Sequence, residues 1–311
     1  MPKILISDSL SSIAKDIFES NNIDVDIKTE LSLLELKKNI KNYDGLIVRS
    51  ATKVTKEIIE SGQNLKIIGR AGAGVDNIDV ECSKKKGIVV MNTPGGNTNA
   101  TAEHTFALLF ALYKNITEAN KSTHEGYWEK KKFKGLELKD KKIGLIGFGN
   151  VANRVSQLAK GFNMEIVTCS KSFESRKKNF PDVKSVQLEE LIRSCDIISF
   201  HCKIEKDGNP IINKKELSKM KKNSVIINTA RGNLVNEIDL KEALDNSIIS
   251  GAAVDVFSEE PAKENILFGT KNLILKQHIA ASTIEAQVNV AKQIAEQVCD
   301  FFNNDKIINE V

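Results

Sequence analysis

The chain has 311 residues, of which 41% are apolar and 28% are charged, and its formal net charge is +4. This length exceeds the usual size of one hydrophobic core, so we expect two domains or one large α/β domain. The small positive charge is at most a weak bias toward anionic ligands, and no nucleic-acid partner is expected. No apolar run reaches the length of a membrane-spanning helix.

The amino terminus and the cysteines indicate the cytoplasm. The chain enters the apolar run 4–6 without the charged leader and apolar core of a signal peptide. Its five cysteines are odd in number and show no CxxC spacing, so neither a disulfide framework nor a metal site is predicted. We expect a cytoplasmic protein with buried free thiols and no bound metal.

The first hundred residues alternate between short β-rich runs and amphipathic helical stretches. Strands separated by helices predict parallel pairing and a doubly wound sheet. The predicted strands are 3–7, 25–27, 45–48, 66–69 and 88–91, and the predicted helices are 11–21, 31–40, 55–61 and one that ends at residue 87.

A second series of the same kind begins at residue 142. Its predicted strands are 143–146, 165–169, 196–201, 224–228, 252–256 and 273–275, with helices at 150–162, 188–193 and 237–245. A largely apolar helix at 100–115 suits a connector, and a last helix at 283–302 can return to the first domain. The sequence therefore predicts an α/β protein with two Rossmann-like or flavodoxin-like doubly wound parallel-sheet domains and a cleft between them.

The strand at 143–146 runs into a glycine-rich turn and then into a helix. The turn reads Gly147-Phe148-Gly149-Asn150-Val151-Ala152, which matches GxGxxG/A in the right context. Gly147 permits the tight turn, Gly149 lets the main chain approach a pyrophosphate, and Ala152 allows close packing of helix on strand. The helix N-terminus offers free N–H groups to the phosphates. We predict a dinucleotide site at Gly147, Gly149, Asn150 and Val151; the alternative is a turn without a ligand.

The next strand should end in an acid that holds the ribose 2′-hydroxyl of NAD, about 20 residues further on. Here the strand ends Cys169-Ser170-Lys171, and Arg176 follows. The acid that would repel a 2′-phosphate is absent, while hydroxyl and cationic groups are present. Ser170 and Lys171 are therefore predicted to bind the cofactor, NAD or NADP, with a leaning to NADP. A surface loop that only lost its acid is the alternative.

Longer motifs resemble the D-isomer-specific 2-hydroxyacid dehydrogenases over essentially the whole chain. The matching segments are RSAT (49–52), GRAGAGVDNID (69–79), NTPGGN (92–97), WEKKKFKG (128–135), NTARG (228–232), AVDVFSEEP (253–261) and HIAASTIEAQ (278–287). The resemblance implies a discontinuous substrate-binding domain made of 1–96 and 283–311 and a dinucleotide-binding domain at 97–282. It is strongest to the members that oxidise 3-phospho-D-glycerate in serine biosynthesis and that end without a regulatory domain.

The resemblance also implies a catalytic set of Arg231, Glu260 and His278. An arginine can bind the carboxylate of a 2-oxo acid and polarise its carbonyl group. A histidine can supply or remove the proton of the hydroxyl oxygen near neutral pH. A carboxylate bonded to the imidazole orients the ring and favours its protonated form. Glu260 fits that place better than Glu259 because it directly precedes Pro261.

Further roles follow from the resemblance alone. Asp255 is expected to contact the nicotinamide carboxamide, and His201 and Cys202 to lie along the adenosine. Two neighbours of Arg231, Thr229 and Ala230, are also expected to contact the cofactor. The substrate-binding positions are Arg49, Ser50, Ala73, Gly74, Asn97 and Gln287. Arg49 suits a phosphate at the far end of the substrate.

Three departures from the family pattern bear on specificity. Gln277 stands where a proline usually precedes the histidine, and Ala280 replaces a glycine where the main chain approaches the substrate. Ser170 replaces the ribose-binding acid. None of these removes a reacting group, but together they leave the choice of substrate and cofactor open.

The leading interpretation is a nicotinamide-dependent oxidoreductase that converts 3-phospho-D-glycerate to 3-phosphohydroxypyruvate. A glyoxylate or hydroxypyruvate reductase is the alternative, favoured by the NADP-like loop and Ala280 and disfavoured by Arg49 and Gln287. A dinucleotide-sensing corepressor is a remote third candidate. The expected partners are a small 2-hydroxy or 2-oxo acid and a second copy of the chain, in a homodimer or tetramer, with no membrane.

Overall fold

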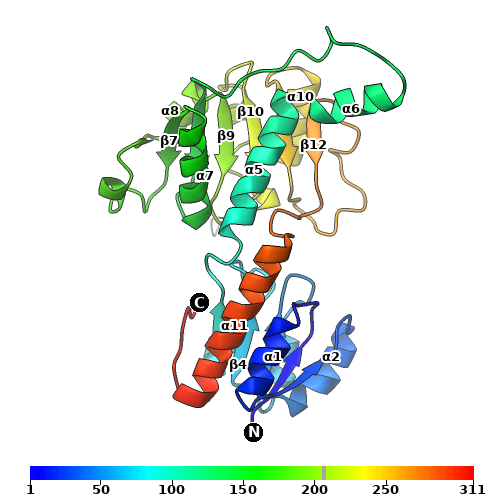
Figure 1. Ribbon diagram of the computed structural model, residues 1–311, viewed down its shortest axis with the longest axis vertical. Helices are drawn as coiled ribbons and strands as arrows, with labels where there is room; N and C mark the ends of the chain where they lie inside the picture. The colour runs from blue at the N-terminus through cyan, green and yellow to red at the C-terminus, as the bar shows by residue number, and fades with distance from the viewer. Residues whose placement is uncertain (205–207) are drawn as a thin grey trace. The chain divides into compact units, whose positions relative to one another are not determined.

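The computed structural model describes residues 1–204 and 208–311 and divides the chain into two compact units (Figure 1). Unit 1 consists of Met1–Asn97 and Ser282–Val311, and unit 2 of Thr98–Ala281. Each unit holds a parallel sheet with helices on both faces, which confirms the predicted fold class. No helix in the described ranges has the length and apolar character needed to cross a membrane.

Unit 1, whose residues are all described, contains a five-stranded sheet in the order β2-β1-β3-β4-β5. Every neighbouring pair is parallel, and the order is that of flavodoxin-like folds. The strands are β1 (Lys3–Ile6), β2 (Asp24–Ile27), β3 (Gly45–Val48), β4 (Ile67–Arg70) and β5 (Val89–Asn92), and the helices are α1 (Ile13–Ser20), α2 (Leu33–Asn39), α3 (Lys56–Ser61), α4 (Val80–Lys85) and α11 (Ile284–Asn304).

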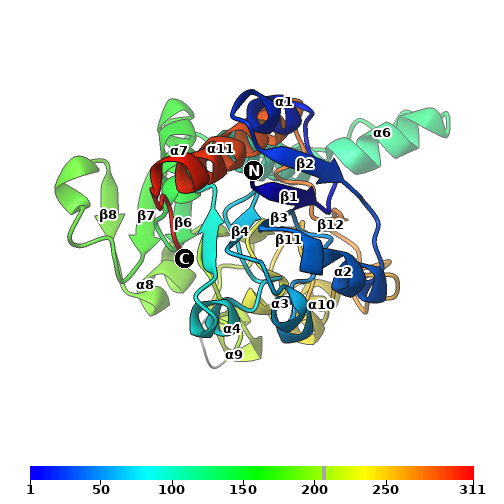
Figure 2. The ribbon, with the colours of Figure 1, turned by 90° about the horizontal axis from the view of Figure 1, so that it is seen from below.

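Helices cover both faces of this sheet (Figure 2). On one face, α1 and α11 bury Phe18 and Ile294 against β1, β3 and β4. On the other face, α2 and α3 bury residues such as Leu36 and Ile58 against the same strands. The long helix α11 begins at the N-cap Thr283, whose side chain accepts the Ala286 N–H, a bond typical of helix starts. The last helix thus packs on the first domain, as predicted.

The sheet of unit 2 has seven strands within its described residues, in the order β12-β11-β10-β9-β6-β7-β8. All neighbouring pairs are parallel. The chain order reverses between β6 and β9, and ligands of doubly wound sheets bind at such a switch point. The strands are β6 (Lys142–Ile146), β7 (Glu165–Cys169), β8 (Val183–Ser185), β9 (Ile197–Phe200), β10 (Val225–Asn228), β11 (Gly251–Val254) and β12 (Leu273–Leu275).

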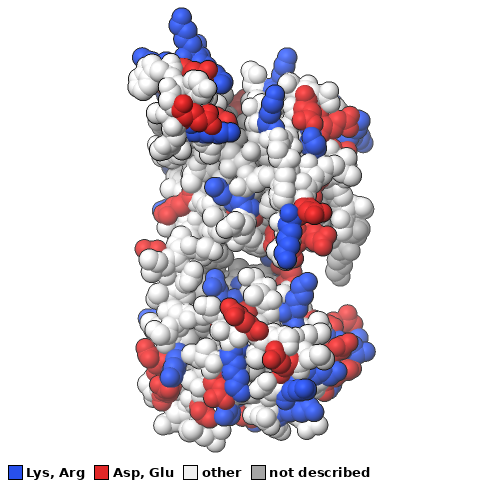
Figure 3. Space-filling model, turned by 90° about the vertical axis from the view of Figure 1, so that its right-hand side faces the viewer, with Lys and Arg blue, Asp and Glu red and all other residues white. Residues whose placement is uncertain are grey.

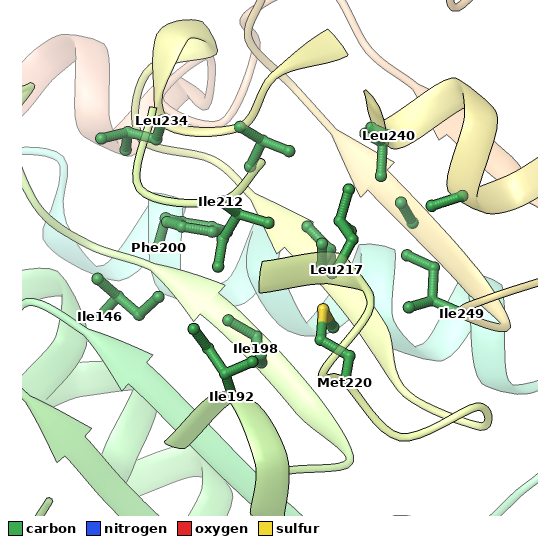
Figure 4. Close-up of a cluster of buried hydrophobic side chains, with 14 of the residues drawn as sticks. Ile146, Ile192, Ile198, Phe200, Ile212, Leu217, Met220, Leu234, Leu240 and Ile249 are labelled. Carbon is green, nitrogen blue, oxygen red and sulfur yellow. The ribbon is translucent and has the colours of Figure 1, made fainter. Parts of the chain in front are cut away.

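Two apolar clusters hold this sheet between helices: α5 (Thr98–Tyr113) and α7 (Asn150–Gly161) on one face, and α8 (Leu188–Ser194), α9 (Lys214–Leu217) and α10 (Glu237–Asp245) on the other. Figure 4 shows part of the second cluster, in which Ile198 and Phe200 of β9 pack near Ile212 and Leu217. Because these strands are buried on both faces, they read as continuous apolar runs. Their carboxyl ends carry the residues predicted to bind the cofactor.

The structure also contains elements that the sequence did not predict, namely β8, α9 and α6 (Ile116–His124). Helix α6 is mostly polar, with a buried Ser122 and an exposed Ile116, so it lacks the apolar stripe on which helix prediction relies. Acidic and basic side chains intermingle on the face drawn in Figure 3, in line with the small net charge.

Candidate active site

His278 and Glu260 form a close pair at the surface of unit 2. The imidazole Nδ1 lies 2.6 Å from Glu260 Oε2, and the two side chains are 44% and 34% exposed. The other oxygen of the same carboxylate accepts the main-chain N–H of Phe257 at 3.0 Å. Both oxygens of Glu260 are therefore engaged, and Nε2 is the ring nitrogen left to exchange a proton with a ligand. The two residues predicted to act together are in contact.

The pKa of the Glu260 carboxyl lies below its usual value. Partial burial favours the neutral form and raises this pKa, but the hydrogen bonds with His278 and with the Phe257 N–H outweigh that effect. The carboxylate is therefore ionised at neutral pH. It can hold the imidazole in one orientation with Nδ1 directed toward it.

Asp255 supports the backbone on which His278 sits. Its side chain is fully buried, and its two oxygens accept the N–H groups of Ile279 and Ala280 at 2.9 and 2.8 Å. Its main-chain carbonyl accepts the His278 N–H at 2.7 Å. His278 itself has a φ of 57°, a left-handed conformation that non-glycine residues seldom adopt. A buried carboxylate needs such partners, and here they fix the histidine segment.

Arg231 follows β10 in a turn that Asn228 closes. The Asn228 side chain accepts the Ala230 N–H at 3.1 Å and donates to the Arg231 carbonyl at 2.8 Å. The next residue, Gly232, lies against the loop that leads to Glu260, since a Cβ there would fall 1.9 Å from the Phe257 carbonyl carbon. Direct contact of these two loops brings the chain at Arg231 and the chain at Glu260 together.

The glycine turn follows β6, at the switch point of the sheet. Gly147 has a φ of +89°, and a Cβ there would lie 2.6 Å from the His201 carbonyl oxygen. A Cβ on Gly149, the N-cap of α7, would instead point into open space. Ala152, in the first turn of α7, is fully buried. The turn is thus tight where it passes His201 and open at the start of α7, where Asn150 and Val151 follow.

His201 and Cys202 leave the end of β9, beside this turn. The His201 ring lies 2.9 Å from the Ser199 hydroxyl through Nε2. Burial lowers the pKa of His201 to about 3, so its ring is neutral at physiological pH. This residue can contact an adenosine but brings no positive charge to a phosphate.

The loop after β7 folds back over the glycine turn. The guanidinium of Arg176 donates to the Phe148 carbonyl oxygen and, through Nε, to the Ser172 carbonyl oxygen at 3.4 Å. The hydroxyl groups of Ser170 and Ser172 lie 3.4 Å apart. Residues from this loop and from the turn therefore lie together at one edge of the sheet, with two hydroxyl groups and a guanidinium among them.

The predicted substrate-binding residues Arg49, Ser50, Ala73 and Gly74 lie in unit 1, and so do Asn97 and Gln287. The three residues predicted to be catalytic, Arg231, Glu260 and His278, lie in unit 2. Arg49 and Ser50 follow β3, and Ala73 and Gly74 follow the neighbouring β4. Two loops at adjacent strand ends thus carry four of these residues. Gln287 lies in the first turn of α11.

Sequence reasoning missed Asp8, which holds the Arg49 loop in place. This carboxylate is 6% exposed and accepts the N–H groups of Arg49 and Thr52 at 2.5 and 3.2 Å. Asn77 donates to the carbonyl oxygens of the same two residues, each at 2.7 Å. The sequence signal that could have identified Asp8 is an aspartate just after the first predicted strand, where the carboxyl ends of the parallel strands lie side by side.

Sequence reasoning also missed His104 of α5, whose Nε2 lies 3.6 Å from Asp255 Oδ1. The neighbouring Thr105 hydroxyl lies 3.1 Å from that of Thr229, one of the predicted cofactor residues. Within residues 1–204 and 208–311 no group of three or more His, Cys, Asp or Glu side chains is arranged to hold a metal ion.

Residues 106–280 match the model of the D-isomer specific 2-hydroxyacid dehydrogenase, NAD binding domain. That is more than half of the chain, so the chain belongs to the D-isomer specific 2-hydroxyacid dehydrogenase family. The resemblance read from the motifs is confirmed.

A D-3-phosphoglycerate dehydrogenase of Archaeoglobus fulgidus is 40% identical over 310 residues, which are 99% of this chain and 59% of that relative. The chain spans 54 to 59% of the length of this relative and of those from Synechocystis and Bacillus subtilis.

Two solved structures share the fold over nearly all of both chains. One is an NAD+-bound 3-phosphoglycerate dehydrogenase of Entamoeba histolytica, with a TM-score of 0.84, 30% identity and coverage of 100% of this chain and 98% of the other. The second is an acyclic imino acid reductase, Bsp5, in complex with NADPH and D-Arg, with a TM-score of 0.89, 32% identity and 99% coverage of each chain.

Proposed function

We propose that this protein transfers a hydride between a nicotinamide dinucleotide and a D-2-hydroxy acid, with 3-phospho-D-glycerate oxidised to 3-phosphohydroxypyruvate as the principal reaction. The observation that carries the proposal is the 2.6 Å contact of His278 Nδ1 with Glu260 Oε2. The names of the relatives and the basic Arg49 favour a phosphorylated substrate.

The residues of unit 2 divide the work of the proton transfer. His278 Nε2 takes the proton of the 2-hydroxyl group during oxidation and returns it to the carbonyl oxygen during reduction. Glu260 keeps the ring oriented and stabilises the imidazolium that forms. Arg231 binds the substrate carboxylate next to the reacting carbon. Asp255 keeps His278 in its left-handed backbone conformation.

The glycine turn fits a dinucleotide, because a pyrophosphate has room at Gly149, where a Cβ would meet no atom. Gly147, Gly149, Asn150 and Val151 would hold the pyrophosphate at the helix N-terminus, and Ser170, Lys171, His201, Cys202, Thr229 and Ala230 would contact other parts of the dinucleotide. The Asp255 side chain is fully buried with both oxygens bonded to main-chain N–H groups, so we assign it the anchoring role in place of the predicted contact with the nicotinamide carboxamide. The bound nicotinamide supplies or accepts the hydride. Unit 2 is thus the dinucleotide-binding domain and unit 1 the substrate-binding domain.

For the choice of dinucleotide we propose NADP over NAD. No acid stands at position 170, and two hydroxyl groups and the Arg176 guanidinium lie beside the glycine turn. Arginine pairs well with phosphate oxygens. The Bsp5 reductase, whose structure is a complex with NADPH, supports this proposal, whereas the NAD+-bound Entamoeba enzyme favours NAD.

We further propose a cytoplasmic homodimer. All five cysteines are free, as is usual in reducing compartments. The carboxyl-terminal half of helix α5 is largely apolar, and the rings of Phe106 and Phe110 pack against Phe162, which is 40% exposed. Trp128, 82% exposed, follows in the same region of the chain. Such exposed aromatic surface is typical of an interface.

The test is a steady-state assay of the purified protein that compares the reduction of 3-phosphohydroxypyruvate, hydroxypyruvate and glyoxylate, each with both reduced dinucleotides. The proposal expects the highest kcat/KM with the phosphorylated substrate. The NADP-type loop favours a second candidate, a glyoxylate or hydroxypyruvate reductase, which would instead turn over the unphosphorylated acids faster. Absence of turnover with every pair contradicts both.

A further inference from the structure

Glu237 is the first residue of α10 and follows Arg231 by six positions. Its carboxylate takes three hydrogen bonds from a separate loop. Oε1 accepts the Ser258 N–H at 2.8 Å, and Oε2 accepts the Ser258 hydroxyl and the Asn265 side-chain amide, both at 2.9 Å. One half-buried carboxylate therefore holds the loop between residues 258 and 265.

That loop carries Glu260. Phe257 donates its N–H to Glu260 Oε1, and the main chain of Phe257 and Ser258 lies against Gly232, where a Cβ would fall within 2.4 Å of three of its atoms. The loop is thus held at two points: its main chain packs against Gly232, and its polar groups bind the Glu237 carboxylate. Both belong to the segment that begins at Arg231.

Any movement of residues 257–260 is passed on to the imidazole. One oxygen of Glu260 is bonded to the Phe257 N–H and the other to His278 Nδ1. A displaced loop therefore moves the carboxylate and, with it, the imidazole. Displacement of a reacting group by about 1 Å can lower a rate about 100-fold.

We propose that Glu237 is a positioning residue that sets the place of the Glu260–His278 pair relative to Arg231. The inference rests on the proposed function, in which these three residues act on one substrate. Glu237 touches neither the substrate nor the reacting atoms and acts through the Ser258 loop. Its loss should lower kcat and leave dinucleotide affinity unchanged, because the glycine turn is a separate part of unit 2.

The variant Glu237→Gln tests this with little change of shape. Ser258 N–H and the Asn265 amide donate to different oxygens of Glu237, so either orientation of a glutamine amide sets an NH2 group against a donor. Asn265 cannot turn its own amide without losing the bond that its Oδ1 accepts from the Leu267 N–H at 2.9 Å. The matched control is Glu242→Gln in the same helix, since Glu242 pairs with Lys214 at the surface.

Two readouts separate positioning from general damage. The first is the NMR signal of the His278 Nδ1–H, which the short bond to Glu260 moves downfield; the chain has four histidines, and His278→Gln identifies the signal by its loss. The second is the separate effect on kcat and KM. For Glu237→Gln we expect the signal to shift upfield or disappear and kcat to fall about tenfold or more, with dinucleotide affinity within twofold. Glu242→Gln should change none of these.

An unchanged His278 signal together with kcat within about twofold of the unaltered protein overturns the proposal. If Glu237→Gln does not fold, Ser258→Ala is tested instead, because it removes only the bond of the Ser258 hydroxyl. We expect a smaller change in the His278 signal and in kcat. An unchanged signal together with an unchanged kcat overturns the proposal for this variant too. The NMR signal does not require turnover. An inactive parent protein would therefore contradict the proposed function, while the signal still decides whether Glu237 positions the pair.

Discussion

The N–H of His278 donates to the carbonyl oxygen of Asp255 at 2.7 Å, and the side chain of the same aspartate binds the two residues that follow. One buried residue thus holds three successive N–H groups from residues 278 to 280. This explains how His278 can keep a left-handed backbone conformation at the carboxyl ends of the strands. The cost of that conformation is offset by the three hydrogen bonds that Asp255 accepts from residues 278 to 280.

The first prediction follows from that arrangement. Asp255→Asn replaces one accepting oxygen by an NH2 group that faces a main-chain N–H in the fully buried site. We expect the free energy of unfolding to fall by about 1–3 kcal/mol, measured by urea denaturation. The control Asp245→Asn removes an exposed partner of Lys241 and should change stability by about 0.5 kcal/mol or less. Equal, small effects of both substitutions would contradict the anchoring role of Asp255.

The second prediction concerns pH and the Glu260–His278 pair. Burial opposes ionisation of Glu260, but the bonds from His278 and Phe257 hold its pKa in the folded protein below the ordinary 4.5. A group with such a lowered pKa stabilises the fold above its unfolded-state pKa, and this contribution is lost as the pH falls through the folded-state pKa.

The unaltered protein should therefore be more stable than Glu260→Gln at about pH 5–6, and the difference should shrink as the pH falls below about 4.5. Chemical denaturation of both proteins across this range measures it. A difference that grows toward low pH would show that the pKa of Glu260 is raised and that the pair does not stabilise its ionised form.

The third prediction concerns the choice of dinucleotide. Ser170→Asp places a carboxylate where a 2′-phosphate would lie, and like charges at an interface can cost several kcal/mol. For the unaltered protein we expect the ratio of kcat/KM with NADP to kcat/KM with NAD to lie between one and about a hundred, since a hydrogen bond to a charged group contributes about 1.5–3 kcal/mol. The variant should shift the ratio of kcat/KM values toward NAD.

Ser175→Asp, an exposed position further along the same loop, is the control for a charge that is merely nearby. It should shift the ratio less than Ser170→Asp does. If the unaltered protein prefers NAD by more than about tenfold, the interpretation of the Ser170 loop is wrong.

The fourth prediction is that two chains associate through the apolar region around α5, Phe162 and Trp128. Light scattering at micromolar concentration should give at least twice the chain mass of 34.4 kDa. Phe110→Glu puts a charge at the edge of the ring cluster, and we expect it to weaken association. Lys114→Glu, a polar position just after the helix, is the control. A single 34.4 kDa species for the unaltered protein would refute the homodimer.

The strands and most helices could be predicted because their patterns are long or their signals local. Buried parallel strands contain continuous apolar runs, such as 143–146 and 225–227, bounded by polar residues. The GxGxxA motif indicates both a turn and the start of a helix. Strand β8 has three residues and one buried side chain, too few to establish a period. Helix α6 was missed because it is mostly polar and so shows no apolar residues at helical spacing.

The candidate catalytic residues could be predicted from the sequence, whereas the residues that hold their loops in place could not. His278, Glu260 and Arg231 could be named because their motifs are specific to the family, and the structure joins the first two directly. The supporting residues Asp8, Asp255 and Glu237 make side-chain bonds to main-chain groups 21 to 44 positions away. No local pattern encodes such bonds. Asp255 was named for a contact with the cofactor, and its role as an anchor emerged only from the structure.

The most direct test of the central claim, that His278 is the proton-transferring residue of a 2-hydroxyacid dehydrogenase, compares the unaltered protein with His278→Ala in the oxidation of 3-phosphoglycerate. Proton transfer by a positioned side chain contributes about 10²–10⁴-fold to a rate. We predict a fall of kcat within that range, with dinucleotide affinity and the folded circular dichroism spectrum unchanged because the side chain is partly exposed. A variant that keeps more than about a tenth of the rate contradicts the claim.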